Sequence, residues 1–187
     1  MENTAAKTFT YSVEPDDVLH SRTLELSGES EADAVETISL LSIRIGRNEY
    51  ALHTGEVRQV VSTANVMPVP QSPHHVLGIA NMRGDIVSVF DLAALTIDEP
   101  MATVNRPNLI QVDYEDTTVC FAVAEPPNSL TIPVDTIKKQ ASNPPADPNG
   151  LVAEYVELGE HLIQIIPVDR LLAHRALVQL ISSYSAE

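Results

Sequence analysis

The stretch GIANMRGDIVSVFDL, residues 78–92, decides the fold of this chain. Apolar residues alternate with small or polar ones on both sides of the polar group NMRGD, which is typical of two strands with one buried face. Gly84 supplies the backbone freedom that a tight turn needs, so we predict a β-hairpin that turns at Arg83 and Gly84. A turn does not need an arginine, and the chain contains only 11 Lys and Arg residues against 26 Asp and Glu. The role of Arg83 is therefore the first question that the sequence raises.

Further short strand patterns surround this hairpin. They are LSIRI (41–45), NLIQVDY (108–114), TTVCFAV (117–123), YVEL (155–158) and HLIQII (161–166). Pro126 and Pro127 exclude a central strand at their positions, because proline cannot donate to a sheet ladder. Many short strands at close spacing predict a mainly β fold, either a small barrel or a sandwich. Parallel βαβ units are disfavoured, because only one predicted helix is long enough for a crossover.

Helical patterns are few. We predict a short helix near 54–61, with Thr54 as its cap and three valines on one face. Asp91 is placed to cap a brief helical turn. A longer C-terminal helix is predicted near 170–183, with Asp169 as its cap.

Charge and composition divide the chain into two parts. Residues 1–37 contain nine acidic and two basic residues and no sustained apolar pattern, so we expect a disordered acidic tail. Residues 38–187 are expected to form a single domain. The net charge of −15 argues against binding to nucleic acid or to anionic membranes. A lone Cys120 excludes an intramolecular disulfide, and the absence of a long apolar run leads us to expect a cytoplasmic protein without membrane insertion.

The sequence offers little that could perform catalysis. The adjacent His74 and His75 point to opposite sides of an extended segment, so they are poorly placed to bind one metal together. Cys120 lies within an apolar alternation, which is typical of a buried, unreactive thiol. We therefore predict a protein that is not an enzyme and that needs no cofactor or metal. A small-ligand-binding barrel or a minor hydrolase remains an alternative, and it requires a closed pocket that joins these three side chains.

Protein–protein contact is the remaining class of function. Strand edges and proline-rich extended segments are surfaces that partner proteins bind. Arg83 could contribute there, because its planar guanidinium can bind a carboxylate through two hydrogen bonds. From the pattern alone, Arg83 could equally be a solvated turn charge.

The stretch VMPVPQSPHHVLGIANMRGDIVSVFDL, residues 66–92, resembles the signature of the CheW-like domain, found in the coupling protein of bacterial chemosensory arrays. The similarity extends from about Ile38 to Leu172 and includes NEYAL near its start and EYVELGEHLIQIIPVDRLL near its end. The resemblance implies two small SH3-like β-barrels that share an apolar core. It also implies a stand-alone adaptor that bridges chemoreceptor cytoplasmic tips to the regulatory domain of a CheA-type histidine kinase. Such an adaptor would work in the cytoplasm at membrane-associated receptor arrays.

The resemblance also implies a set of protein-binding residues. Carried over by position, these are Arg83, Asn81, Met82, Gly84, Val57, Gln59, Gly78 and Leu109. At the position of Gln59 the family often has a glutamate able to pair with the motif arginine. Arg83 is therefore either free here or paired with Glu56 or Asp85.

Two departures from the family pattern keep a second adaptor function open. They are Gln59 and the pair Pro126 and Pro127, which interrupts a stretch of the second lobe. An inhibitory or pathway-specific adaptor, for example in pilus-based motility, would bind the kinase but not the receptors.

Overall fold

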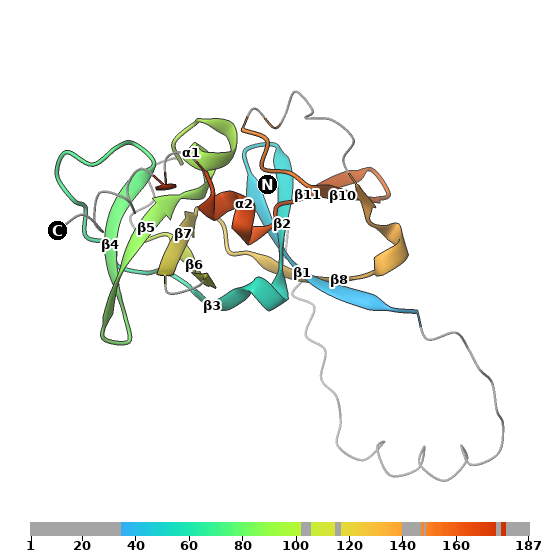
Figure 1. Cartoon of the computed structure of the whole chain (residues 1–187), viewed down its shortest axis with the longest axis horizontal. Helices are drawn as coiled ribbons and strands as arrows, with labels where there is room; N and C mark the ends of the chain where they lie inside the picture. The colour runs from blue at the N-terminus through green and yellow to red at the C-terminus, as the bar shows by residue number, and fades with distance from the viewer. Residues whose placement is uncertain are drawn as a thin grey trace, which may run out of the picture. The chain divides into compact units, whose positions relative to one another are not determined.

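The computed structural model describes residues 35–101, 106–114, 117–139, 147, 149–174 and 177–178. Its strands form two sheets, which we call barrel A and barrel B (Figure 1). Barrel A has the strand order β8-β1-β2-β11-β10-β9, and barrel B has the order β3-β6-β7-β5-β4. Barrel A contains β1 (Thr37–Ile45), β2 (Asn48–His53), β8 (Asn128–Pro133), β9 (Lys138–Lys139), β10 (Glu154–Leu158) and β11 (His161–Ile165). Barrel B contains β3 (Val57–Val61), β4 (Val76–Met82), β5 (Asp85–Asp91), β6 (Asn108–Tyr114) and β7 (Thr117–Val123).

In each sheet, a segment of the chain connects the two edge strands. In barrel A, β8 continues through the 3₁₀ turn Val134–Thr136 into β9, so the two edge strands follow each other in sequence. In barrel B, the chain that leaves β3 returns to β4, where Met67 and Ile79 exchange two backbone hydrogen bonds of 2.8 and 2.9 Å. These connections join the edges of each sheet, although β8 and β9, and β3 and β4, remain edge strands that are not paired with each other. The mainly β fold of two small barrels is therefore confirmed.

The largest apolar core lies between the barrels. Along β7, Val119, Phe121 and Val123 face this shared core, whereas Cys120 and Ala122 face the interior of barrel B. All five side chains are buried. Because both faces of the strand are covered, β7 reads as a continuous apolar run, as expected for a strand buried on both sides. The expected apolar core between the two barrels is confirmed.

Two short helices lie at the junction of the barrels. In α1 (Leu92–Ile97), the buried Asp91 accepts hydrogen bonds from the N–H groups of Ala93 and Ala94, so the predicted cap is confirmed. In α2 (Val168–Leu172), apolar residues pack into the shared core, and the helix lies between the two groups of strands (Figure 1).

The prediction of a helix near 54–61 is wrong. Thr54–Glu56 form a single 3₁₀ turn without a side-chain cap, and Val57 already begins β3. The valines at 57, 60 and 61 fit a helical face, but β3 pairs antiparallel with β6 and Val60 points to solvent. β-Branched side chains favour strands, and the neighbouring β6 supplies the backbone hydrogen bonds that decide between the two.

The C-terminal helix α2 begins at Val168, two residues earlier than predicted, and ends at Leu172. Pro167 precedes α2 as its cap residue, so the prediction of Asp169 as the cap is wrong. The Asp169 carboxylate instead accepts a hydrogen bond of 2.7 Å from the N–H of Arg170. Ala173 is the C-terminal cap residue of α2, and the side chain of Val178 is exposed. The predicted residues 179–183 lie outside the described part of the chain.

The expectation of a disordered tail over residues 1–37 concerns mostly residues outside the described part. The first described strand, β1, begins at Thr37. No helix among the described residues has the length and apolar character to cross a membrane.

Candidate functional site

The β4–β5 hairpin turns at the two residues that the sequence predicts. Met82 and Asp85 are paired in register, which leaves Arg83 and Gly84 as a two-residue loop. Both loop residues have positive φ angles, 59° for Arg83 and 107° for Gly84. Positive φ at both positions is the requirement of a type I′ turn. Asn81 holds the loop from within, because its Oδ1 accepts a hydrogen bond of 2.8 Å from the Gly84 N–H.

Arg83 adopts a backbone conformation that its side chain disfavours. The left-handed region costs a residue with a β-carbon roughly 1–2 kcal/mol, and Asn or Gly normally stands at this position. The side chain is exposed and forms no hydrogen bond or ion pair with any residue that the structure describes. Glu56 and Asp85, the two partners considered above, do not hold it. An arginine kept in a strained conformation without an internal partner is a candidate contact residue.

Glu56 is directed elsewhere. Its Oε1 accepts a hydrogen bond of 3.4 Å from the Val168 N–H at the start of α2. The Glu56 carboxylate therefore links the residue before β3 to the start of α2. It is not the partner of Arg83.

Exposed apolar side chains accompany Arg83 on the hairpin. Asn81 is paired with Ile86, and Ile79 is paired with Met67. Cross-strand partners share one face of a sheet, and so do residues two apart on a strand. Met67 is 68% exposed and Ile86 is 63% exposed. We call Met67, Ile79, Asn81, Arg83 and Ile86 the outer hairpin face.

The sequence-based reasoning missed Met67 and Ile86 as members of this face. For Ile86 a signal exists in the alternation of DIVSVF, because Val87 and Val89 point into barrel B and Ile86 must then lie on the opposite face of β5. For Met67 no such signal exists, since its orientation follows from the bridge to Ile79 rather than from a local pattern.

Two of the predicted binding residues lie inside barrel B. Met82 is 6% exposed and Leu109 is 0% exposed, and both belong to the interior cluster that contains Cys120. Buried side chains cannot contact a partner directly. Met82 and Leu109 instead pack in the interior of barrel B, on the opposite face of the sheet from the outer hairpin face.

Glycine is the only residue type that fits at position 78. Its φ angle is 143°, and a β-carbon at this position would lie 2.0 Å from the Met67 carbonyl oxygen. The main chains of β4 and of the segment at Met67 approach each other closely here, which allows the hydrogen bonds that close barrel B. Gly78 therefore positions Met67 on the outer hairpin face.

The predicted residues on β3 lie apart from the outer hairpin face. Val57 packs against the shared core. The amide nitrogen of Gln59 donates a hydrogen bond to the side-chain oxygen of the buried Gln111 on β6. No contact within the described chain joins Gln59 to Arg83.

The side chains proposed for a ligand-binding or hydrolytic site are not brought together. Cys120 is fully buried inside barrel B, and burial raises the pKa of its thiol to about 11. His74 is mostly exposed, with its Nε2 3.6 Å from Asp98 Oδ1, and it packs edge to face on His75. Within the described ranges, no group of three or more His, Cys, Asp or Glu side chains could hold a metal ion. The closed pocket required by that alternative is not formed by these residues.

A family model described as the CheW-like domain matches residues 39–176, which is most of the chain. The chain belongs to the CheW-like domain family. Among curated relatives, it is 34% identical over 95 residues to the chemotaxis protein CheW of Thermotoga maritima, covering 49% of this chain and 60% of that protein. It is 25% identical over 111 residues to the protein PilI of Pseudomonas aeruginosa, covering 59% of this chain and 62% of that protein.

A solved structure shows the same fold. The scaffolding protein TtCheW from Thermoanaerobacter tengcongensis superposes with a TM-score of 0.61 at 20% sequence identity, covering 70% of this chain and 89% of that one. The two sequence matches given above each span less than two thirds of the relative's length. The CheW-like fold is therefore shown over more of the chain than the close sequence similarity is.

Within this CheW-like domain, both departures from the family pattern have a structural explanation. Position 59 carries an amide, and Gln111 binds that amide within barrel B. Pro126 and Pro127 precede the first paired residue of β8, and β8 is an edge strand of its sheet. The expectation that these prolines exclude a central strand is confirmed, and barrel A accommodates them without losing a ladder hydrogen bond.

Proposed function

We propose that this CheW-like domain is a non-catalytic adaptor of a bacterial chemosensory pathway. In this role it couples the cytoplasmic tips of chemoreceptors to the regulatory domain of a CheA-type histidine kinase, in the cytoplasm at receptor arrays. Membership of the family supports the adaptor class, and the solved neighbour is described as a scaffolding protein. The observation that carries the proposal is the exposed Arg83, held in a strained turn without a described internal partner.

The outer hairpin face has the properties of a protein-binding surface. The two-residue loop and the Asn81 hydrogen bond fix the backbone before a partner arrives, so little conformational freedom is lost on binding. Arg83 offers a planar donor for a carboxylate, and arginine is enriched among residues that dominate binding energies. The exposed side chains of Ile86 and Met67 add apolar area next to that charge. The partner surface is therefore expected to carry a carboxylate beside apolar side chains.

An adaptor of this kind requires rigid surfaces and no reacting group. The fully buried Cys120, with its raised pKa, is protonated at neutral pH and is not a nucleophile. The shared core joins the two barrels into one rigid support for such surfaces.

The substitution Arg83→Ala tests the proposal. Partner binding, measured by pull-down with the cognate kinase and receptor and by reconstitution of kinase activation, is expected to weaken at least about tenfold. The melting temperature is expected to stay nearly unchanged, because alanine keeps the left-handed strain and Arg83 has no described internal contact. Arg47→Ala, in the exposed β1–β2 turn, is the matched control and should bind as the wild type does. Absence of binding to any cognate kinase or receptor by the wild-type chain would refute the adaptor function.

A second candidate is a pathway-specific or inhibitory adaptor that binds the kinase alone. The similarity to the protein PilI and the engagement of Gln59 by Gln111 favour keeping it. Separate titrations with the kinase regulatory domain and with a receptor fragment distinguish the two functions. Binding to both partners supports the coupling adaptor, and binding to the kinase only supports the second candidate.

A further inference from the structure

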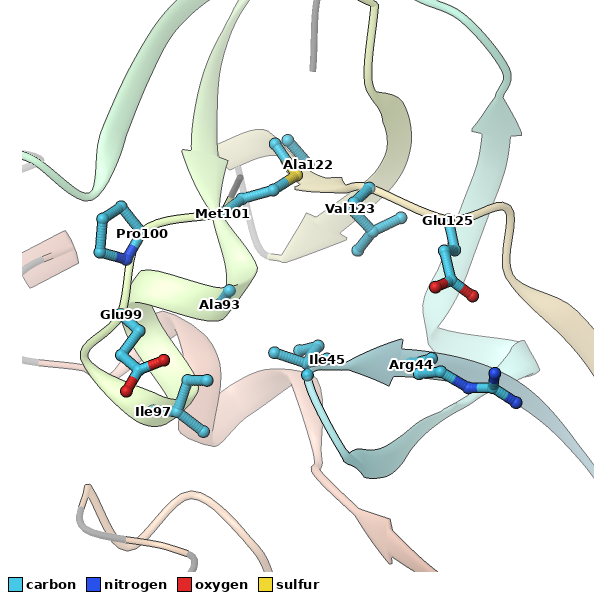
Figure 2. A pocket seen from close by; sticks show the side chains of 12 residues that line it. Arg44, Ile45, Ala93, Ile97, Glu99, Pro100, Met101, Ala122, Val123 and Glu125 are labelled. Carbon is cyan, nitrogen blue, oxygen red and sulfur yellow. The ribbon is translucent and has the colours of Figure 1, made fainter. Parts of the chain in front are cut away.

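The junction between the two barrels is hollow on one side. A groove of about 400 Å³ is lined by Ile45 at the end of β1 in barrel A, by Ile97 of α1 and by Val123 at the end of β7 in barrel B (Figure 2). Side chains along an open groove lack packing partners on one side, so they do little to fix the angle between the barrels. The burial of the shared core drives the barrels together but has no preferred direction. Hydrogen bonds do have one, because they weaken steeply when their angle changes.

One such bond crosses from barrel A to barrel B. Residues 149–152 lead into barrel A, where the Ala153 N–H donates a 3.0 Å hydrogen bond to the Ile165 carbonyl oxygen of β11. The side-chain amide of Asn149 donates a 2.7 Å hydrogen bond to the Leu95 carbonyl oxygen of α1. Because α1 follows β5 directly, it moves with barrel B. The Asn149 amide therefore ties the two barrels together.

Arg170 of α2 holds the same segment from a second direction. Its Nη1 donates hydrogen bonds of 2.7 Å to the Val152 carbonyl oxygen and of 3.4 Å to the Gly150 carbonyl oxygen. The side chain of Val152 is buried in the shared core. The guanidinium thus fixes the backbone that carries both the Asn149 amide and a core side chain.

Glu56 makes the second connection between the barrels. It ends the 3₁₀ turn Thr54–Glu56, which leads from β2 of barrel A into β3 of barrel B. Its Oε1 accepts the 3.4 Å hydrogen bond from Val168, the first residue of α2. The bond attaches α2 to the point where the chain passes from one barrel to the other. We call Asn149, Arg170 and Glu56 the clasp.

We propose that the clasp fixes the angle between the barrels and thereby orients one partner of the adaptor relative to the other. This inference rests on the adaptor function proposed above, in which the outer hairpin face of barrel B binds one partner. A second partner that contacts barrel A is then held at the angle that the clasp sets. The three clasp residues are positioning residues, because they act through the barrels that they join. Loss of the clasp should leave each binding step intact and reduce kinase activation.

Residual dipolar couplings of the ¹⁵N-labelled full chain test the effect on the angle. The double variant Asn149→Asp and Arg170→Gln removes the donors of the clasp with little change in side-chain size. In the wild type, one alignment should fit the couplings of both barrels. In the double variant, the couplings of barrel A should be reduced relative to those of barrel B. Arg58→Gln is the matched control, since Arg58 pairs with Asp113 inside barrel B, and it should keep one alignment.

The effect on function is measured as a split between binding and activation. In the double variant, the dissociation constants for the kinase regulatory domain and for a receptor fragment, titrated separately, should change less than about twofold. Receptor-dependent kinase activation in reconstituted arrays should fall at least about fivefold. Arg170→Lys keeps a donor for the same carbonyl groups and should restore most of the activation.

A variant that only destabilises the fold separates positioning from stability. Val152→Ala removes core packing but keeps every hydrogen bond of the clasp, so it should lower the melting temperature and still activate the kinase at temperatures where it is folded. Loss of activation by this variant to the same degree as by the double variant would overturn the proposal.

Three further results would overturn it. They are unchanged dipolar couplings in the double variant, full kinase activation despite a changed angle, and a loss of partner binding as large as the loss of activation. A wild-type chain that binds neither kinase nor receptor would instead refute the adaptor function. The dipolar couplings of the free protein would in that case still decide whether the clasp fixes the angle.

Discussion

The β4–β5 and β10–β11 hairpins turn through loops of equal length, yet they place different residues at the same position. In β10–β11 the first loop residue is Gly159, with a φ angle of 63°. In β4–β5 the first loop residue is Arg83, with a φ angle of 59°. Glycine adopts this conformation without strain, whereas arginine does not. This difference supports the proposal that Arg83 is kept at the strained position for the side chain that it presents.

The largest expected difference between the two hairpins concerns their glycines. Gly78→Ala would place a β-carbon 2.0 Å from the Met67 carbonyl oxygen, so we expect the free energy of unfolding to fall by about 3 kcal/mol or more. Gly159→Ala meets no atom within 4 Å and should cost only the left-handed strain, about 1 kcal/mol. Urea denaturation of both variants measures the two losses. Equal losses would show that the main-chain approach at Gly78 does not limit the fold.

The two sides of the β4–β5 hairpin should separate stability from binding. Met82→Ala removes a buried side chain from barrel B, and we expect a loss of about 2–4 kcal/mol in the free energy of unfolding. Ile86→Ala removes an exposed side chain and should change that free energy by less than about 0.5 kcal/mol. Kinase binding should weaken for Ile86→Ala. Normal binding by this variant would remove Ile86 from the contact surface.

Replacing Arg83 by asparagine, which the turn favours, should stabilise the fold and weaken partner binding. Arg83→Asn creates the Asn-Gly pair typical of type I′ turns, and we expect the free energy of unfolding to rise by about 0.5–1 kcal/mol. Partner binding should weaken at the same time. Arg47→Asn is the control, because Arg47 does not have a positive φ angle. A stability decrease for Arg83→Asn would mean that the arginine itself stabilises the hairpin.

The smallest expected effect concerns Asp113 on β6, the second strand in the order of barrel B. The pKa of Asp113 is lowered, first by the hydrogen bond from the Thr118 hydroxyl and then by Arg58. The folded state therefore favours the ionised carboxylate. This stabilisation is present above the unfolded-state pKa and is lost as the pH falls through the lower folded-state pKa. Because the group is exposed, the effect should stay below about 1 kcal/mol.

Stability curves between pH 2 and pH 7 measure this contribution. Asp113→Asn should differ from the wild type near neutral pH and converge with it in acid. Thr118→Ala removes the main donor and should show part of the same change. A difference that persists unchanged at the lowest pH would contradict the assignment to Asp113.

The strands were predictable where their alternation was local. Both strands of the β4–β5 hairpin and its two loop residues are predicted correctly, because one face of each strand alternates with the other within seven residues. β3 was mistaken for a helix, because Val57, Val60 and Val61 fit one helical face, whereas only Val57 and Val61 lie on the partly buried face of the strand. The choice is made by β6, which lies about fifty residues later in the sequence and pairs with β3.

The candidate site was predictable only in part. The resemblance directed attention to Arg83, and the turn confirms its exposed place. Gln59 is engaged by a hydrogen bond to Gln111 and so is not free to bind Arg83 or a partner through that amide. This bond joins two strands that are distant in sequence, so no local pattern reveals it. Met67 became visible as a surface residue only through its bridge to Ile79. Apolar residues look alike in a sequence, and the sheet register decides which of them face solvent.

The parallel pairing of β2 with β11 has a consequence for how the protein is made. Tyr50 on β2 is paired with Gln164 on β11, so barrel A combines residues from both ends of the domain, whereas barrel B is complete at Val123. During synthesis, barrel B can close while β11 is still being translated. At about 5–20 residues per second, the interval between the two events lasts a few seconds. Over this interval the ribosome-bound chain exposes the apolar side chains that later meet between the barrels, which is when chaperones would have most to bind.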